Sequence, residues 1–156
     1  CQSLTHGKAP QVLRFNNANE EFDAVLKEIK RLIDSGVSAK NICVVARTHK
    51  LLDDYISQFT SNGLRCYEIR GNKADDRGLD GIRVATMHRV KGLEFQYIFI
   101  VAANKRIIPL ASAIDHTDSV SEQETMTAEK CLLYVALTRA QKGAYISSYG
   151  QISEFL

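Results

Sequence analysis

The sequence predicts an α/β fold with a mostly parallel β-sheet flanked by helices. Short apolar runs typical of strands alternate along the chain with longer segments in which apolar residues recur every three or four positions, as on one face of a helix. The run "NICVVA" at 41–46 is apolar almost throughout, which favours a strand covered on both faces. Strands and helices that alternate in units of this length are typical of parallel sheets.

The first unit is a strand followed by a helix. Residues 12–15 form the predicted first strand. The helix follows over residues 22–33, where apolar side chains recur at helical spacing. Asn17 or Asn19 is the expected residue at its start, and Gly36 closes it.

The second unit begins with the strand at 41–46. Thr48 can cap the helix that follows, and Gly63 ends it. Residues 64–69 are predicted to form a third strand. The stretch "RGNKADDRGLDG" at 70–81 is polar and rich in Gly and Asp, so we expect a surface loop there.

The second half of the chain holds the remaining strands and one helix. Strands are predicted at 82–85 and 96–101. We expect residues 102–124 to be irregular, because they contain a proline and the polar tract "DHTDSVSEQE". A third helix is predicted over about 125–139, and residues 144–148 form the last strand.

Length and composition indicate one compact domain, residues 1–156, with 45% apolar and 24% charged residues. Because the sequence begins at Cys1, we expect it to be a piece of a longer chain. The formal net charge of +2 is too small to predict nucleic-acid binding by itself. Four cysteines lie far apart without a C-x-x-C pair, which favours reduced thiols over a disulfide or a zinc site: Cys1, Cys43, Cys66 and Cys131.

The sequence also predicts where the protein works. No apolar run approaches the roughly 20 residues that cross a bilayer, so we expect no membrane partner. The opening stretch "CQSLTHGKAP" lacks the apolar region of a signal peptide. Together with the reduced cysteines, these features predict a cytoplasmic protein, and we predict no metal site within the chain.

A polar insert separates the two strands of the segment "RVATMHRVKGLEFQYIFIV" at 83–101. A connection that only turns the chain would favour Asn, Asp, Gly or Pro. This one instead holds Thr86, His88, Arg89, Lys91 and Glu94 around Gly92.

Two arginines also stand beside predicted strands. Open parallel sheets bind ligands outside the carboxyl ends of their strands, and both Arg47 and Thr86 stand at such ends. Arg139 lies where the third helix ends before the last strand. Three separate segments therefore bring polar or cationic groups to loops that can form a site.

Each of these residues, taken alone, has a simpler structural interpretation. Arg47 can be a solvated loop cation, and His88 a structural histidine. Glu94 can be a surface carboxylate at the start of a strand. Arg139 near a helix C-terminus interacts favourably with the helix dipole whatever its function. Only the order of the segments and their residues, taken together, favour a functional interpretation.

The amino-acid sequence of these segments resembles two motifs of the UvrD/Rep-type superfamily 1 DNA helicases. The family patterns are T-x-H-x-x-K-G-L-E-F and a helix reading Y-V-A-L/x-T-R-A. Here they correspond to Thr86, His88 and residues 91–95, and to residues 134–140 in "EKCLLYVALTRAQKGAYI". The segment "ICVVARTHKLLDDYISQF" resembles the motif that precedes them, a strand that ends in arginine before a helix. The likeness covers nearly the whole chain.

The resemblance implies the second of two RecA-like domains, which closes over ATP and Mg²⁺ held mainly by an upstream phosphate-loop domain of the same chain. By that analogy, Arg47 and Arg139 would reach the γ-phosphate across the cleft, where a planar guanidinium can make two charge-assisted hydrogen bonds. Glu94 would accept hydrogen bonds from ribose hydroxyls. Gly92 would allow close backbone approach to the nucleotide beside Lys91.

The same resemblance implies a nucleic-acid track. Thr86, His88 and Arg89 would contact single-stranded DNA near a duplex junction, or couple it to the nucleotide site. Hydroxyl and backbone donors to phosphate position DNA without reading its sequence. The polar insert would therefore join the nucleotide to the DNA.

The chain departs from the family pattern in three respects. No G-x-x-x-x-G-K-[ST] phosphate loop is present, since Gly7-Lys8 is followed by Ala9 and lacks the upstream glycine, and no Mg²⁺-binding acidic motif is recognisable. Many relatives insert an accessory 2B-type subdomain where this chain has only the loop 70–81. Relatives often carry a histidine after a proline in a DNA-contacting loop, whereas this chain has Leu110 after Pro109.

The leading hypothesis is thus the second motor domain of an ATP-dependent DNA helicase or translocase, with a fold like that of phosphate-loop NTPases but no phosphate loop of its own. The isolated chain is expected to bind nucleotide weakly and not to hydrolyse ATP. The alternative is a non-catalytic nucleic-acid-binding or regulatory module that kept the fold. A third, weaker interpretation is a plain nucleotide-binding α/β domain whose charged loops are solvated.

Overall fold

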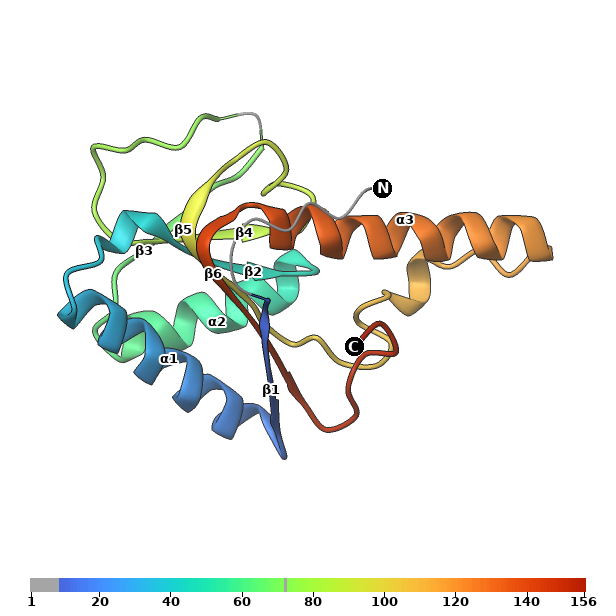
Figure 1. Ribbon diagram of the computed structural model, residues 1–156, viewed down its shortest axis with the longest axis horizontal. Coiled ribbons are helices and arrows are strands. Elements are labelled where there is room, and N and C mark those ends of the chain that lie inside the picture. The colour runs from blue at the N-terminus through green and yellow to red at the C-terminus, as the bar shows by residue number, and fades with distance from the viewer. Residues whose placement is uncertain (1–8, 72) are drawn as a thin grey trace.

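A computed structural model describes residues 9–71 and 73–156, and a six-stranded sheet forms its centre (Figure 1). Cys1 and the Gly7-Lys8 pair lie outside the described residues. All neighbouring strands are parallel, in the order β1-β6-β5-β2-β4-β3. The strands are β1 (Gln11–Phe15), β2 (Ile42–Ala46), β3 (Cys66–Glu68), β4 (Ile82–Thr86), β5 (Phe95–Ile100) and β6 (Ala140–Tyr149).

Helices cover both faces of this sheet (Figure 1). One face packs against α1 (Ala18–Asp34) and α2 (His49–Ser61), and the other against α3 (Ser119–Thr138). Alternate side chains of β2 divide between the two layers, with Val44 in the α1–α2 core and Val45 in the α3 core. Two short 3₁₀ helices complete the fold, at Ala39–Asn41 and Ala111–Ala113. The predicted α/β class with a parallel sheet is confirmed.

The predicted starts and ends of α1 and α2 agree with the structure. The Asn17 side chain accepts a hydrogen bond from the backbone N–H of Glu20 at 2.9 Å, so Asn17 rather than Asn19 caps α1. Thr48 caps α2 by accepting from the Leu51 N–H at 3.3 Å. Gly36 follows α1 with a φ of +107°, a left-handed conformation that glycine adopts without strain.

The third helix is longer than predicted. It begins at Ser119 rather than near 125, so part of the tract expected to be irregular is helical. The Asp118 side chain accepts from the Ser121 N–H at 2.7 Å and starts the helix. Because its first turns project from the body of the molecule, they carry polar side chains and no apolar periodicity that the sequence could reveal (Figure 1).

A buried carboxylate ties α1 to the carboxyl ends of two central strands. Glu21, which is fully buried, accepts hydrogen bonds from the Ala102 N–H at 2.8 Å, the Ser147 hydroxyl at 2.9 Å and the Tyr55 hydroxyl. Burial raises the pKa of Glu21, although these three donors oppose the shift. Glu21 therefore joins α1 and α2 to the carboxyl ends of β5 and β6.

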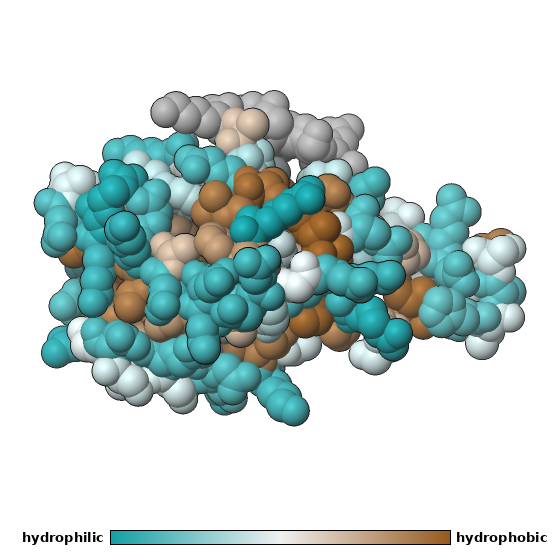
Figure 2. Space-filling view, turned by 90° about the horizontal axis from the view of Figure 1, so that it is seen from below, coloured by the Kyte–Doolittle hydropathy of each residue, from teal (hydrophilic) through white to brown (hydrophobic). Residues whose placement is uncertain are grey.

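The outer surface is mostly hydrophilic. Figure 2 shows one face, on which hydrophilic side chains predominate and apolar ones gather near the middle. Among the described residues, the exposed large apolar side chains are Val12 on β1, Leu79 in the loop before β4 and Val120 on α3. None of the described helices is long and apolar enough to span a membrane.

Candidate functional site

The structure separates the predicted site residues between the two edges of the sheet. Arg47 follows β2, and Thr86 and His88 stand at the end of β4, so these three lie at the carboxyl edge. Glu94 directly precedes β5, and Arg139 directly precedes β6, which places both at the amino edge. The rule that ligands bind at carboxyl ends therefore locates only the first group.

The crossover from β4 to β5 explains this separation. Residues 87–94 start at the carboxyl edge and return to the amino edge across the face that α3 also covers. Met87 and Val90 anchor the crossover, because both side chains are buried in the core on that face. The polar insert recognised in the sequence thus runs from one edge of the sheet to the other.

An open pocket of about 480 Å³ lies at the amino edge. Three predicted residues line it, namely Gly92, Glu94 and Arg139. The remaining lining comes from the loop before β4, the end of the crossover and the start of β5: Asp75, Arg77, Leu93 and Phe95. Gly92 has a φ of +85°, which a residue with a side chain rarely adopts, so the crossover needs glycine at this turn.

Parallel pairing of β5 with β6 brings Glu94 and Arg139 together. Phe95 pairs with Ala140, and the Phe95 N–H donates to the Arg139 carbonyl at 2.9 Å. The residues that precede these two strands must therefore be neighbours. Gln141 also reaches Glu94, since its side-chain amide donates to the carboxylate at 3.2 Å. Sequence reasoning missed Gln141, because only the strand register reveals this contact.

Arg139 carries unused hydrogen-bonding capacity in this pocket. It is the C-cap of α3, and one Nη donates to the Thr138 hydroxyl at 3.2 Å. Its Nε is buried and has no hydrogen-bond partner among the described residues. A guanidinium offers five N–H donors, and a buried donor without a partner costs roughly 1–3 kcal/mol, so Arg139 keeps donors that its neighbours do not satisfy.

Arg47, in contrast, forms a buried ion pair within the domain. Its Nε and Nη2 donate to the two carboxylate oxygens of Glu129 at 3.0 Å and 2.8 Å. Both side chains are buried, with 9% and 6% of their surface exposed. Glu129 also accepts from the Leu110 N–H at 2.8 Å. Burial raises the pKa of Glu129, but these hydrogen bonds outweigh it, and the pKa lies below its ordinary value.

The residues predicted to face nucleic acid lie along the crossover. The Thr86 hydroxyl accepts from the Arg89 N–H at 3.3 Å. Partial loss of solvation and the nearby charge of Arg47 lower the pKa of His88, so its exposed ring is neutral at pH 7. An Nη of Arg89 donates to the Lys73 carbonyl, and its buried Nε has no partner among the described residues. Lys91 is exposed.

Comparison with known proteins identifies the family. The family model for the UvrD-like helicase C-terminal domain matches residues 68–151, more than half of the chain. The chain belongs to this family. Rep of Escherichia coli (strain K12), an ATP-dependent DNA helicase, is 36% identical over 91 residues, which cover 58% of this chain and 12% of that protein.

A second relative is similar over most of the UvrD-like domain. YjcD of Bacillus subtilis (strain 168), named as a candidate ATP-dependent DNA helicase, is 28% identical over 149 residues, or 93% of this chain and 19% of that protein. The domain thus spans about a fifth or less of the length of these curated relatives.

Solved structures share the fold of this UvrD-like domain. The C-terminal domain of a candidate DNA helicase from Lactobacillus plantarum WCFS1 superposes with a TM-score of 0.69 at 18% identity, covering 96% of this chain and 79% of that one. The C-terminal domain of the DEAD-box protein Dbp5 gives a TM-score of 0.54 at 14% identity, covering 91% and 76%. These likenesses confirm the RecA-like fold.

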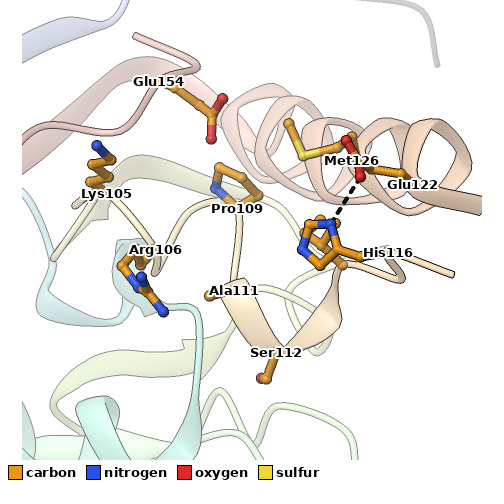
Figure 3. Close-up of a pocket in the computed structure, with 10 residues that line it drawn as sticks. Lys105, Arg106, Pro109, Ala111, Ser112, His116, Glu122, Met126 and Glu154 are labelled. Carbon is orange, nitrogen blue, oxygen red and sulfur yellow. Dashed lines mark hydrogen bonds and ion pairs between the residues drawn. The ribbon is translucent and has the colours of Figure 1, made fainter. Parts of the chain in front are cut away.

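A second pocket of about 670 Å³ lies beside the first turns of α3 (Figure 3). Its charged lining balances Lys105 and Arg106 against Glu122 and Glu154. His116 Nδ1 lies 2.9 Å from a Glu122 carboxylate oxygen, as the dashed line in Figure 3 marks. None of the residues predicted for nucleotide or DNA lines this pocket. In the described part of the chain, no group of three acidic, His or Cys side chains could hold a metal ion.

Proposed function

We propose that this chain is the second motor domain of an ATP-dependent DNA helicase or translocase. It completes an ATP site whose phosphate loop and Mg²⁺ ligands belong to an upstream RecA-like domain of the same chain. The observation that carries the proposal is the amino-edge pocket, in which Glu94, Gly92 and Arg139 meet and a buried Arg139 N–H lacks a partner. Membership of a helicase family supports it.

Arg139 acts as the arginine finger in this proposal. Its guanidinium stays protonated and can donate two parallel hydrogen bonds to γ-phosphate oxygens, where negative charge is neutralised during transfer to water. Such a finger contributes about 10³–10⁵ to kcat in related phosphoryl-transfer enzymes. Glu94 accepts from the ribose hydroxyls, with Gln141 holding its carboxylate. Gly92 allows the backbone to approach the nucleotide closely, beside Lys91.

The crossover makes the DNA contacts. Thr86, His88 and Arg89 meet the phosphates of single-stranded DNA at a duplex junction. The crossover that carries them also ends at Glu94, which supports direct mechanical connection between the DNA and the nucleotide. We also propose that the enzyme is cytoplasmic.

The finger role proposed for Arg47 carries an additional requirement. Because Glu129 holds its Nε and Nη2, Arg47 can make a two-pronged contact with a phosphate through these nitrogens only when that pair opens. While the pair is closed, Arg47 supports the packing of α3 against the end of β2.

ATP hydrolysis by the full-length protein tests the function. With single-stranded DNA present, Arg139→Ala is expected to lower kcat by about 10³-fold or more. Arg14→Ala, at an exposed arginine of β1 outside both pockets, is the matched control and is expected to keep wild-type turnover. An unchanged rate in Arg139→Ala removes the finger role. Absence of DNA-stimulated hydrolysis in the wild-type protein favours the non-catalytic module instead.

A further inference from the structure

A fully buried arginine lies under the amino-edge pocket. Arg83 of β4 has no exposed surface. Its Nε donates to Asp75 at 2.8 Å, and its two terminal nitrogens donate to the Gly81 and Asp76 carbonyls at 2.7 Å each. Its guanidinium carbon lies 4.8 Å from the centre of the Tyr67 ring. Because an unpaired buried charge is strongly destabilising, these contacts hold the loop 73–81 to the sheet.

A second arginine extends this network to the surface. Arg77 donates to the other Asp75 oxygen at 3.4 Å, to the Lys40 carbonyl at 2.7 Å and to the Asn41 side chain. Lys40 returns a hydrogen bond to the Arg77 carbonyl at 2.9 Å. Hydrogen bonds from Arg83 and with the segment before β2 therefore hold the loop in place.

This fixed loop forms one wall of the pocket that contains Glu94 and Arg139. Asp75 and Arg77 both line it, and 48% of the Arg77 side chain is exposed. Asp75 is matched by the buried Arg83. The lining thus holds two guanidinium groups, those of Arg77 and Arg139, and the buried Arg83 outside the lining already pairs with Asp75, one of the two lining carboxylates.

We infer that the loop 73–81 is part of the nucleotide site, with Arg77 contacting the phosphates of the bound nucleotide and Arg83 positioning the loop through Asp75. The inference rests on the proposed function, since it assigns the same pocket to ATP. A polyphosphate is the occupant whose charge and acceptors match two adjacent guanidinium groups. Glu94 binds the ribose, so one wall of the pocket contacts the ribose and the other, with Arg77, contacts the phosphates.

Steady-state ATP hydrolysis by the full-length protein, with saturating single-stranded DNA, tests this inference. Arg77→Ala is expected to raise the KM for ATP about tenfold or more, as loss of a charged hydrogen bond predicts, while kcat and DNA affinity stay at wild-type values. Arg77→Lys is expected to recover part of the loss. The control is Arg14→Ala, which removes an exposed arginine of β1 that lies outside this pocket and outside the loop 73–81.

Competitive inhibition identifies the part of the nucleotide that Arg77 contacts. Inhibition by ADP is expected to weaken in Arg77→Ala, and inhibition by adenosine to stay the same. Equal weakening of both overturns the phosphate assignment. Asp75→Asn, which keeps the shape of the side chain, is expected to raise the KM for ATP several-fold with Arg77 intact if Arg83 positions the loop through it.

The outcome separates this inference from the proposed function. A KM for ATP within twofold of wild type in Arg77→Ala overturns the inference, provided Arg139→Ala abolishes turnover. If Arg139→Ala retains full turnover, the finger role fails, and if the wild-type protein shows no DNA-stimulated hydrolysis, the proposed function itself fails. A thermal unfolding curve for each variant shows that a raised KM does not come from a loss of folded protein.

Discussion

The Arg47–Glu129 pair allows a quantitative test of the structure. The pair joins residues 47 and 129 through two hydrogen bonds of 3.0 Å and 2.8 Å in a buried setting, and Glu129 also holds the Leu110 N–H. Glu129→Ala removes one partner only. It leaves the Arg47 guanidinium buried without a counter-charge and the Leu110 N–H without its acceptor.

The expected cost follows from that geometry. Breaking a buried pair by removing one partner costs about 3–5 kcal/mol, which is a large part of the roughly 5–15 kcal/mol that stabilises a typical domain. The melting temperature of a domain of this size should fall by roughly 6–20 °C, at about 2–4 °C per kcal/mol. Arg47→Ala together with Glu129→Ala removes both charges, so the double variant should cost less than the sum of the two single variants.

Urea unfolding of the single and double variants measures these terms. The control is Glu28→Ala, because the Glu28–Arg31 pair lies on the surface with 62% of the arginine side chain exposed, and such pairs contribute less than about 1 kcal/mol. A cost below 1 kcal/mol for Glu129→Ala, or additive effects in the double variant, would refute the reasoning. ATP turnover of the same variants then separates packing from chemistry, because a stable double variant without turnover would favour a phosphate contact for Arg47.

Three further predictions concern the rest of the chain. Burial raises the native pKa of Glu21 above its ordinary 4.5, so the native state binds the proton more tightly than the unfolded state, and this carboxyl's contribution to stability falls as pH rises from 4.5 through the raised value. Glu21→Gln should remove that slope in melting temperatures measured between pH 4 and about 8, and an unchanged slope would contradict the assignment. Asp118→Ala should destabilise the chain by about 1 kcal/mol in urea, through loss of the α3 cap, whereas a cost near zero would mean that the first turn is not held by this side chain. The chain of residues 1–156 alone, which has no phosphate loop, should show no ATP hydrolysis above background in a coupled assay, and DNA-stimulated turnover would overturn the split-site assignment.

The fold could be predicted from sequence wherever burial leaves a periodic pattern. The run at 42–46 is buried on both faces and reads as a continuous apolar strand, while Asn17 and Thr48 mark the starts of α1 and α2 by their side-chain chemistry. The start of α3 could not be predicted in the same way. Its first turn is exposed and polar, and the helix is held there by Asp118 rather than by an apolar face.

The side-chain partnerships at the site depend on register and topology, which local sequence does not encode. Arg47 and Glu129 are 82 positions apart, and Glu94 and Gln141 are 47 apart. Arg83 stands in the middle of a strand, where its sequence neighbours give no sign that the loop before it supplies its counter-charge. The motifs could therefore name Glu94 and Arg139 separately, but only the pairing of β5 with β6 makes them neighbours.

Two buried arginine N–H groups have no partner among the described residues, one from Arg89 on the crossover and one from Arg139 in the amino-edge pocket. At the carboxyl edge Arg47 is neutralised by Glu129, and the second pocket balances two cations with two carboxylates. At the amino edge the pocket lining places Arg77 and Arg139 beside Asp75 and Glu94, and a buried Arg139 N–H has no partner among the described residues. A parallel sheet that binds its own nucleotide uses the carboxyl edge. A domain that closes over a nucleotide held by another domain has no such constraint, so the phosphate contact proposed for Arg139 is compatible with its place at the amino edge.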